Sequence, residues 1–190
     1  MFDLTGPNDP QCGLSGVRLR TGTVDELDLL CDIDHDASRL FEQAGLFMTS
    51  PHDSELSSAE RRRWLGCLRS QGVLLAVTPE GEAIGFMALH VLDGEPYLEQ
   101  LSVRMQAMRQ GLGSALLAAA QRCAARAGAR CLWLTTYGHL AWNRPFYESA
   151  GFQIVSAEHW GGDMAQEVAF QHRVLPAPDE RVVMRKSLNP

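Results

Sequence analysis

The stretch that most constrains the fold is Met108–Ser114, in which Gly111 and Gly113 are separated by a single residue. The residues before it, Tyr97–Val103, have the pattern of a strand, and those after it, Ser114–Ala127, have the pattern of an amphipathic helix. A glycine turn between a strand and a helix leaves the first N–H groups of the helix without partners, at the positive end of the helix dipole. Such a turn suits a bound phosphate or pyrophosphate group.

The two glycines alone leave a second interpretation open. An ordinary strand–helix turn also uses glycine where two elements pack closely. The stretch lacks the Gly-Lys-Ser/Thr that ends a nucleoside-triphosphate P-loop, and it lacks the third glycine of a dinucleotide-binding fingerprint. A phosphate site of another kind and a plain packing turn therefore both fit the pattern.

The rest of the chain predicts an α/β fold. Three strand patterns, Val73–Val77, Ala83–Leu92 and Tyr97–Val103, are separated by turn residues, among them an Asp93-Gly94 pair typical of a hairpin. Another strand, Cys131–Thr136, follows the helix, and strand–helix–strand units of this kind are right-handed with parallel strands. The other expected elements are a strand at Val17–Arg20, helices after Thr23 and Ser58, a short helix after Asn143, strands at Phe152–Val155 and Val182–Met184, and a weakly helical stretch within 157–178.

Composition and charge narrow the classes of function. The 190 residues are 45% hydrophobic and carry a net charge of −6, which argues against a nucleic-acid partner because phosphate binding requires a basic face. The five cysteines are scattered without a CxxC pair, so we expect neither a disulfide framework nor a metal site. We see no signal peptide and no apolar run of membrane length, and therefore expect a cytoplasmic protein without a membrane partner. Residues 1–15 are expected to form a flexible leader and residues 16–190 a single domain.

Two segments, in this order, resemble motifs of the GNAT superfamily of acetyl-CoA-dependent N-acetyltransferases. The first, Arg109-Gln110-Gly111-Leu112-Gly113-Ser114, is similar to the acetyl-CoA motif Gln/Arg-x-x-Gly-x-Gly/Ala. The second, Trp142–Phe152, resembles the later motif in which a tyrosine, here Tyr147, precedes Gly-Phe by four residues. The resemblance spans roughly residues 17–186. It implies an α/β (α+β) fold with a mixed, mostly antiparallel central sheet of six to seven strands and helices on both faces.

The resemblance also implies acetyl-CoA as co-substrate and an amine as acceptor. The pyrophosphate would lie on the N–H groups of the glycine turn, and the pantetheine arm would pair with the strand before it, in a gap beside Cys131–Thr136. Backbone N–H groups of the same strand would stabilise the developing oxyanion. The residues implied for cofactor binding are Leu101, Ser102, Val103, Arg109, Gln110, Gly111, Leu112, Gly113, Ser114 and Asn143.

Catalysis by direct attack requires an acid and a base. Tyr147 fits the acid that protonates the CoA sulfur in the family, whereas without the family a core aromatic is the simpler interpretation. Glu99 is the first candidate for the base, because an acidic residue in a mostly apolar strand needs a reason. A solvent-facing or salt-bridged role explains Glu99 equally well. His90, on the neighbouring strand, and His139, in the loop before Asn143, are the second and third candidates.

Three positions depart from the family pattern. Met108 stands where the motif usually has Gln or Arg, and we expect a modest loss of affinity because the loop binds mainly through its backbone. Many relatives have a cofactor-contacting Asn seven residues before the Tyr, where this chain has Leu140. Asn143 either takes over that contact or caps the short helix, and capping is the simpler role. Thr135 stands where some protein N-terminal acetylating relatives carry a base, which argues against that branch.

The sequence thus predicts an acyltransferase that moves an acetyl group from acetyl-CoA to a primary amine of a small molecule or peptide. A non-catalytic acyl-CoA-binding or sensor domain is the alternative, and an unrelated nucleotide-phosphate binder is a third hypothesis. A homodimer, common among relatives, is a further expectation. Acidic residues of the first helix suggest a cationic acceptor, although a solvated helix face explains them as well; these residues are Asp32, Asp34, Asp36 and Glu42.

Overall fold

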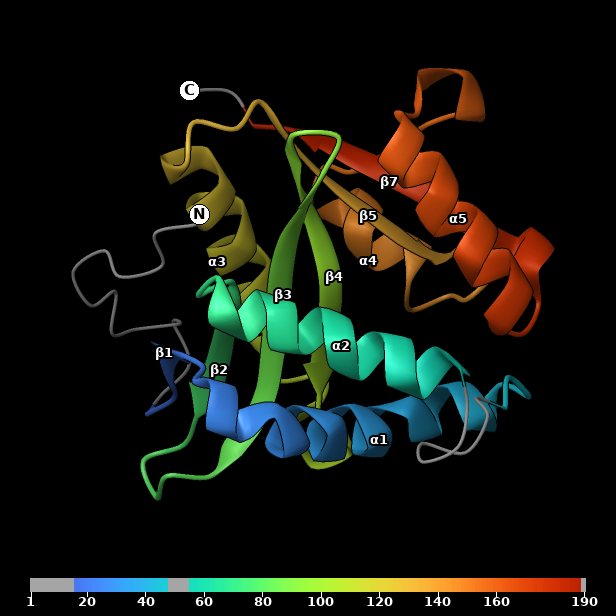
Figure 1. Ribbon diagram of the computed structural model, residues 1–190. Helices are drawn as coiled ribbons and strands as arrows, with labels where there is room; N and C mark the ends of the chain where they lie inside the picture. The colour runs from blue at the N-terminus through green and yellow to red at the C-terminus, as the bar shows by residue number, and fades with distance from the viewer. Residues whose placement is uncertain (1–15, 48–54, 189–190) are drawn as a thin grey trace.

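The computed structural model describes residues 16–47 and 55–188, and the expected leader, residues 1–15, lies outside them. The described residues form a seven-stranded sheet in the order β1-β2-β3-β4-β5-β7-β6, flanked by helices (Figure 1). Only β4 and β5 are parallel neighbours, so the predicted mixed and mostly antiparallel sheet is confirmed. In chain order the elements are β1 (Arg18–Thr21), α1 (Leu27–Gln43), α2 (Glu55–Arg69), β2 (Val73–Val77), β3 (Ala83–Leu92), β4 (Glu95–Val103), α3 (Leu112–Arg126), β5 (Cys131–Tyr137), α4 (Arg144–Ser149), β6 (Gln153–Ile154), α5 (Gly162–Val174) and β7 (Arg181–Ser187).

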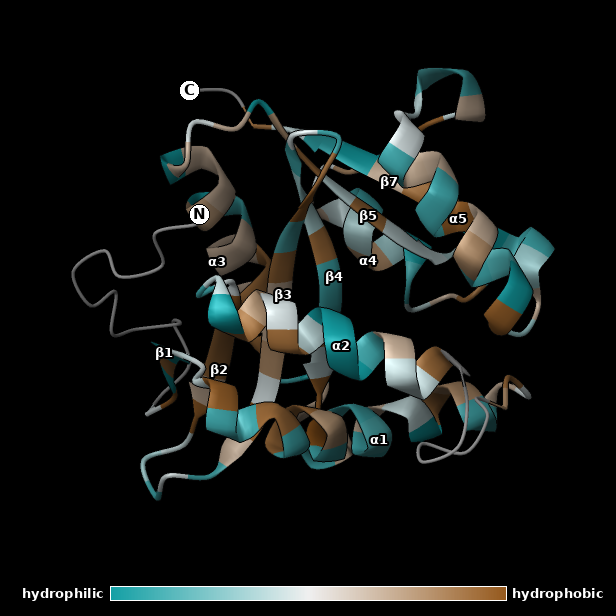
Figure 2. Cartoon of the chain, in the orientation of Figure 1, coloured by the Kyte–Doolittle hydropathy of each residue, from teal (hydrophilic) through white to brown (hydrophobic). Residues whose placement is uncertain are grey.

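Helices cover both faces of the sheet because the central strands are apolar on both sides. Leu75 and Phe86 pack in one core cluster with residues of α1 and α2. Their strand neighbours Leu74 and Met87 pack in the other, with residues of α3. Figure 2 shows β2 and β3 largely in brown, and α1 and α2 in alternating teal and brown. No described helix combines the length and apolar character needed to cross a membrane.

Several boundaries differ from the sequence prediction by a few residues. The sequence predicts a second helix that begins after Ser58, but α2 already includes Glu55. The last strand extends to Ser187 because β7 pairs with β5 along its whole length. The expected capping box is present, with Thr23 N–H donating to Glu26 Oε2 at 2.9 Å, but it begins a 3-10 turn, Val24–Glu26, that precedes α1.

The hairpin between β3 and β4 has a second function at its tip. Asp93 and Gly94 have φ angles of 50° and 78°, as the predicted two-residue turn requires. The Asp93 carboxylate accepts hydrogen bonds from the N–H groups of Asp163 and Met164, both at 2.9 Å, in the first turn of α5. A Cβ on Gly161 would collide with the Asp93 carboxylate, so glycine permits this close approach. The hairpin tip therefore caps α5 and fixes its position.

The parallel pair β4–β5 separates soon after it forms. The two strands pair only at Tyr97 with Trp133 and at Leu98 with Leu134. At the same place the register between β3 and β4 shifts by one residue, and Glu99 is the extra residue of a β-bulge. A bulge bends and twists its strand. The end of β4 is thereby turned away from β5, which opens the sheet along the C-terminal halves of both strands.

Candidate active site

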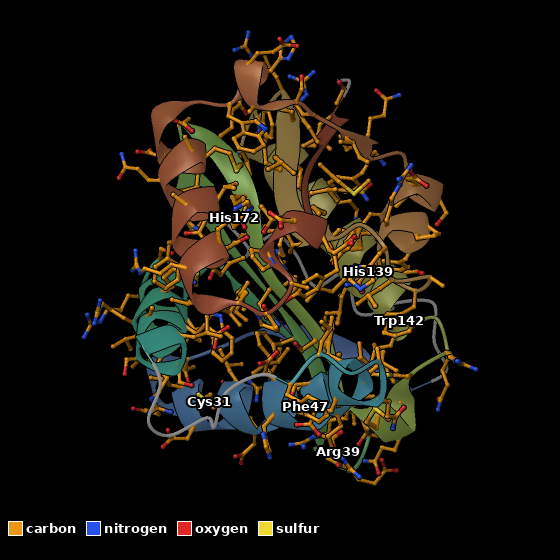
Figure 3. The ribbon with its side chains drawn as sticks, turned by 90° about the vertical axis from the view of Figure 1, so that its right-hand side faces the viewer. Cys31, Arg39, Phe47, His139, Trp142 and His172 are labelled. Carbon is orange, nitrogen blue, oxygen red and sulfur yellow. The ribbon has the colours of Figure 1, made fainter. Side chains whose placement is uncertain are left out.

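A cavity of about 430 Å³ lies where β4 and β5 have separated. Its wall includes Met108 and Gly113 of the glycine turn at one end, and Glu60 of α2 and Arg181 of β7 elsewhere. In Figure 3, the loop before α4, which carries His139 and Trp142, lies above α1, which carries Cys31. Trp142 is 38% exposed and contacts Phe41 of α1 edge-to-face at 6.5 Å between ring centroids. The volume is within the range of pockets that bind small molecules and cofactors.

The glycine turn presents unpaired backbone donors. Gly111, at the N-cap of α3, has a φ of 85°, which an L side chain rarely adopts. The first helical hydrogen bond runs from Ala115 N–H to the carbonyl of Gly111, and the N–H groups of residues 112–114 find no partner within the described residues. A Cβ on Gly113 would meet only the ring of Phe146, at 3.7 Å. The fold itself therefore tolerates a side chain at Gly113, and its absence widens the cavity beside the free N–H groups.

The residues predicted to bind the cofactor fall into three positions. Leu101, Ser102 and Val103 line the cavity on the part of β4 that is not paired with β5. The turn residues lie at the start of α3, where Leu112 is buried and presents only its backbone. Asn143 occupies the N-cap position of α4 but makes no side-chain capping bond, so the predicted capping role is wrong. Its side chain lines the cavity instead.

Tyr147 lines the cavity from α4. Its ring packs between Phe146 and Phe152, at centroid distances of 5.1 and 5.9 Å. Burial raises the pKa of Tyr147 to about 12, while the nearby charge of Arg181 acts in the opposite sense. The phenol is therefore protonated at neutral pH, and its hydroxyl makes no hydrogen bond to the described residues. A proton held in this way is available to a leaving group in the cavity.

Comparison with known proteins now identifies the architecture. Residues 33–152 match the family described as the acetyltransferase (GNAT) family. The chain belongs to this family. Its fold is similar to that of PaiA N-acetyltransferase from Thermoplasma acidophilum in complex with coenzyme A, with a TM-score of 0.64 and 17% identity over 90% of this chain and 98% of that chain. It is also similar to the ribosomal-protein-S18-alanine N-acetyltransferase of Escherichia coli, with a TM-score of 0.61 and 18% identity over 92% and 95% of the two chains.

A third similar structure is N-acetylglutamate synthase from Neisseria gonorrhoeae, in complex with coenzyme A and N-acetyl-glutamate. The TM-score is 0.64 and the identity 16%, and the match covers 92% of this chain but only 35% of the synthase. At such identities these likenesses establish the fold and not the substrate. The part of the site that binds the acceptor must therefore be inferred from the residues of this GNAT acetyltransferase itself.

Glu99 lies on the cavity wall, and its side chain is 5% exposed. Its Oε1 forms an ion pair with Arg63 Nε at 2.7 Å, and its Oε2 lies 2.9 Å from His90 Nε2. Glu99 therefore matches the second interpretation given above, that of a salt-bridged strand residue. His90 contacts Glu99 but is not part of the cavity wall. His139 also lies outside the wall, 3.4 Å from a carboxylate oxygen of Glu180.

Two acidic groups that face the same space are not among the predicted catalytic or cofactor-binding residues of this acetyltransferase. Asp34 of α1 accepts hydrogen bonds from Ser102 Oγ at 2.6 Å and Gln100 Nε2 at 2.5 Å, so it holds the bulged end of β4. Burial raises the pKa of Asp34. Burial also raises the pKa of Glu60 to about 8, and the carboxylates of Asp34 and Glu99 contribute in the same direction. Glu60 has a signal in the sequence, because it lies four residues from both Leu56 and Trp64, on the apolar face of α2.

The acidic residues of α1 therefore do not form a simple solvated face. Asp34 bonds to β4, and Asp36 Oδ2 accepts a hydrogen bond from Met105 N–H at 2.7 Å. Both carboxylates tie α1 to the segment that leads into the glycine turn. The number of acidic residues on α1 is thus a poor guide to the charge of the acceptor.

Proposed function

We propose that this protein transfers an acetyl group from acetyl-CoA to a primary amine. One observation carries the proposal: a continuous cavity joins the unpaired N–H groups of the glycine turn, the free end of β4 and the side chain of Tyr147. In the proposed complex the pyrophosphate lies at residues 109–114, where the helix dipole favours negative charge. The pantetheine arm pairs with Leu101–Val103, and Asn143 contacts the cofactor from α4.

The chemistry follows from the same arrangement. The amine lone pair attacks the acetyl carbonyl carbon, and backbone N–H groups of β4 stabilise the oxyanion that forms. The C–S bond then breaks, and the thiolate takes the proton of the Tyr147 hydroxyl. The amine must lose a proton as well, and we assign its acceptor to Glu60. Both oxygens of Glu99 are already engaged by Arg63 and His90, whereas the pKa of Glu60, raised to about 8, suits a base near neutral pH.

The test is thiol release from acetyl-CoA across amines, amino acids, aminoglycosides, polyamines and peptides. Release that depends on one class of amine supports the proposal. Replacing Tyr147 with Phe is expected to lower kcat about a hundredfold or more, since it removes a general acid, and to leave the Kd for acetyl-CoA unchanged. Full activity in Tyr147→Phe would make the acid assignment wrong. Tight acetyl-CoA binding without release to any amine would favour the non-catalytic binding domain instead.

Homodimer formation stays a prediction, and sedimentation velocity tests it directly. The same experiment with and without acetyl-CoA shows whether the co-substrate affects association.

A further inference from the structure

The most unusual charge in the cavity is that of Arg181, the first residue of β7. Its Nη2 donates hydrogen bonds to Thr135 Oγ1 and Gln171 Oε1, both at 2.8 Å. Its guanidinium lies over the ring of Tyr137, 4.7 Å from the centroid. Its Nε is buried without a hydrogen-bond partner. All of these contacts are to neutral groups, and none offsets the positive charge.

The other arginines of the cavity wall differ in this respect. Arg63 pairs with Glu99 at 2.7 Å and with Glu167 at 2.9 Å, and Arg61 pairs with Asp28 at 2.7 Å. Within residues 16–47 and 55–188, no carboxylate lies within ion-pair distance of Arg181. Since a guanidinium keeps its charge at any pH a protein experiences, the cavity contains a permanent cation that has no counter-ion among the described residues.

The surroundings of Arg181 hold it in one orientation. The Tyr97 hydroxyl lies 2.8 Å from Thr135 Oγ1 and accepts a hydrogen bond from Gln171 Nε2 at 3.2 Å, so the two acceptors of Arg181 are themselves fixed. Gln171 is 6% exposed and belongs to α5, which the Asp93 cap holds in place. Both N–H groups of Nη2 are thus engaged, and a guanidinium held in this way presents its remaining N–H groups in a fixed direction, where they can donate charge-assisted hydrogen bonds to an anion.

We propose that the acceptor of this enzyme carries a carboxylate in addition to its amine, and that Arg181 binds that carboxylate. The acceptor is thus an amino acid or another small amphoteric amine, with its amine directed toward Glu60 and the acetyl group. That the bound molecule is an acetyl acceptor rests on the proposed function, whereas its carboxylate is inferred from Arg181 itself. It replaces the purely cationic acceptor that the acidic residues of α1 suggested.

A second anion has to be distinguished from the acceptor. The CoA thiolate forms near Tyr147, and Arg181 is close enough to Tyr147 for its charge to affect that phenol. If Arg181 stabilises only the thiolate, its loss slows transfer to every acceptor equally. If it binds the acceptor carboxylate, its loss affects acceptors that have a carboxylate much more than acceptors that lack one.

The experiment compares amino acids with their carboxamides, which keep the amine and lose the negative charge. With wild-type protein, kcat/KM for the best amino acid is expected to exceed that for its amide at least about tenfold, as a charged hydrogen bond implies. In Arg181→Gln, kcat/KM for the amino acid falls about ten- to a hundredfold further than the value for the amide, mainly through KM. Arg181→Lys keeps the positive charge but lacks the planar guanidinium, and it is expected to recover part of the preference for the acid over the amide. Arg61→Gln, whose native arginine has its own carboxylate partner, is the matched control and keeps the full preference.

Equal use of acid and amide by the wild type, or an equal loss with both in Arg181→Gln, would overturn the inference and leave acetyl transfer itself intact. If no amine is acetylated, the proposed function fails, and binding decides the inference separately. Calorimetric titration of the twenty amino acids and their amides into protein saturated with coenzyme A would then be performed on wild type and Arg181→Gln. Carboxylate-dependent binding lost in the variant supports Arg181 as the anion site, and the absence of such binding refutes it.

Discussion

Replacing Glu60 with Gln is expected to stabilise the protein in alkaline solution while reducing its activity. The pKa of Glu60 lies at about 8 instead of its ordinary 4.5, chiefly because of burial. Between these two pH values the folded protein holds a proton that the unfolded chain has released, so the free energy of unfolding falls as the pH rises. At about 1.4 kcal/mol per pH unit, the penalty reaches at most about 5 kcal/mol above pH 8. Gln resembles the protonated form and is free of this penalty.

Urea unfolding of wild type and Glu60→Gln, followed by circular dichroism at pH 5, 7 and 9, measures the effect. The two proteins are expected to be similar at pH 5, and the variant is expected to be more stable by roughly 3–5 kcal/mol at pH 9. At pH 7 only about one tenth of Glu60 is ionised, so kcat/KM of the wild type should rise with pH toward a plateau above pH 8.

The kinetic part of the experiment uses Glu99→Gln as the comparison. Glu60→Gln should lose about a hundredfold in kcat together with the rise that ends near pH 8, because the proton acceptor is missing. A rise of kcat/KM with pH that is caused by deprotonation of the acceptor amine should remain in both variants. Its persistence in Glu60→Gln would therefore identify the amine as the cause. Parallel stability curves for wild type and Glu60→Gln would refute the account of the pKa of Glu60. An unchanged rate in Glu60→Gln, with a lost rate in Glu99→Gln, would move the base to Glu99.

Two other substitutions test the framework of the site. Gly113→Ala should raise the free energy of unfolding by up to about 1 kcal/mol, because alanine favours a helix and its Cβ meets only Phe146. Calorimetry should nevertheless show weaker coenzyme A binding, and unchanged affinity would mean that Gly113 leaves no space for the ligand. Asp93→Ala should lower the free energy of unfolding by about 1–2 kcal/mol, since two N–H groups of α5 lose their cap. Asp93→Asn keeps an acceptor oxygen and should lose less, so equal losses in the two variants would contradict a capping role.

The central part of the fold could be predicted from sequence because its signals are local. The strands β2, β3 and β4 are apolar runs bounded by turn residues, and the Asp93-Gly94 turn and the glycine turn each reveal their geometry through residue type. Helix α5 gave only a weak signal, because it is held by Asp93, which lies 70 residues away in the sequence. Contacts of that kind are not encoded in any periodicity.

The site was predictable only in part, for a similar reason. Tyr147 and the turn residues belong to sequence motifs, and they all lie on or beside one cavity. The environment of Glu99 depends on Arg63 and His90, which come from other elements. Glu60 occupies an apolar helix face that the sequence does reveal, but its raised pKa arises from burial and from Asp34 on a different helix. Likewise, only the folded chain shows that Arg181 has no counter-ion within the part of the chain that the structure describes.

The short contact between β4 and β5 has a mechanical consequence. With pairs at only two positions, Tyr97–Trp133 and Leu98–Leu134, the sheet consists of a four-stranded half and a three-stranded half that meet at a seam. Each half has an internal edge of unpaired N–H and C=O groups, which is the kind of edge that invites strand addition and aggregation. Here the edge faces the cavity, whose wall includes residues of α1, α2 and α4. In the proposed complex the pantetheine arm occupies this edge, so the co-substrate acts as an eighth, removable strand that joins the two halves during each turnover.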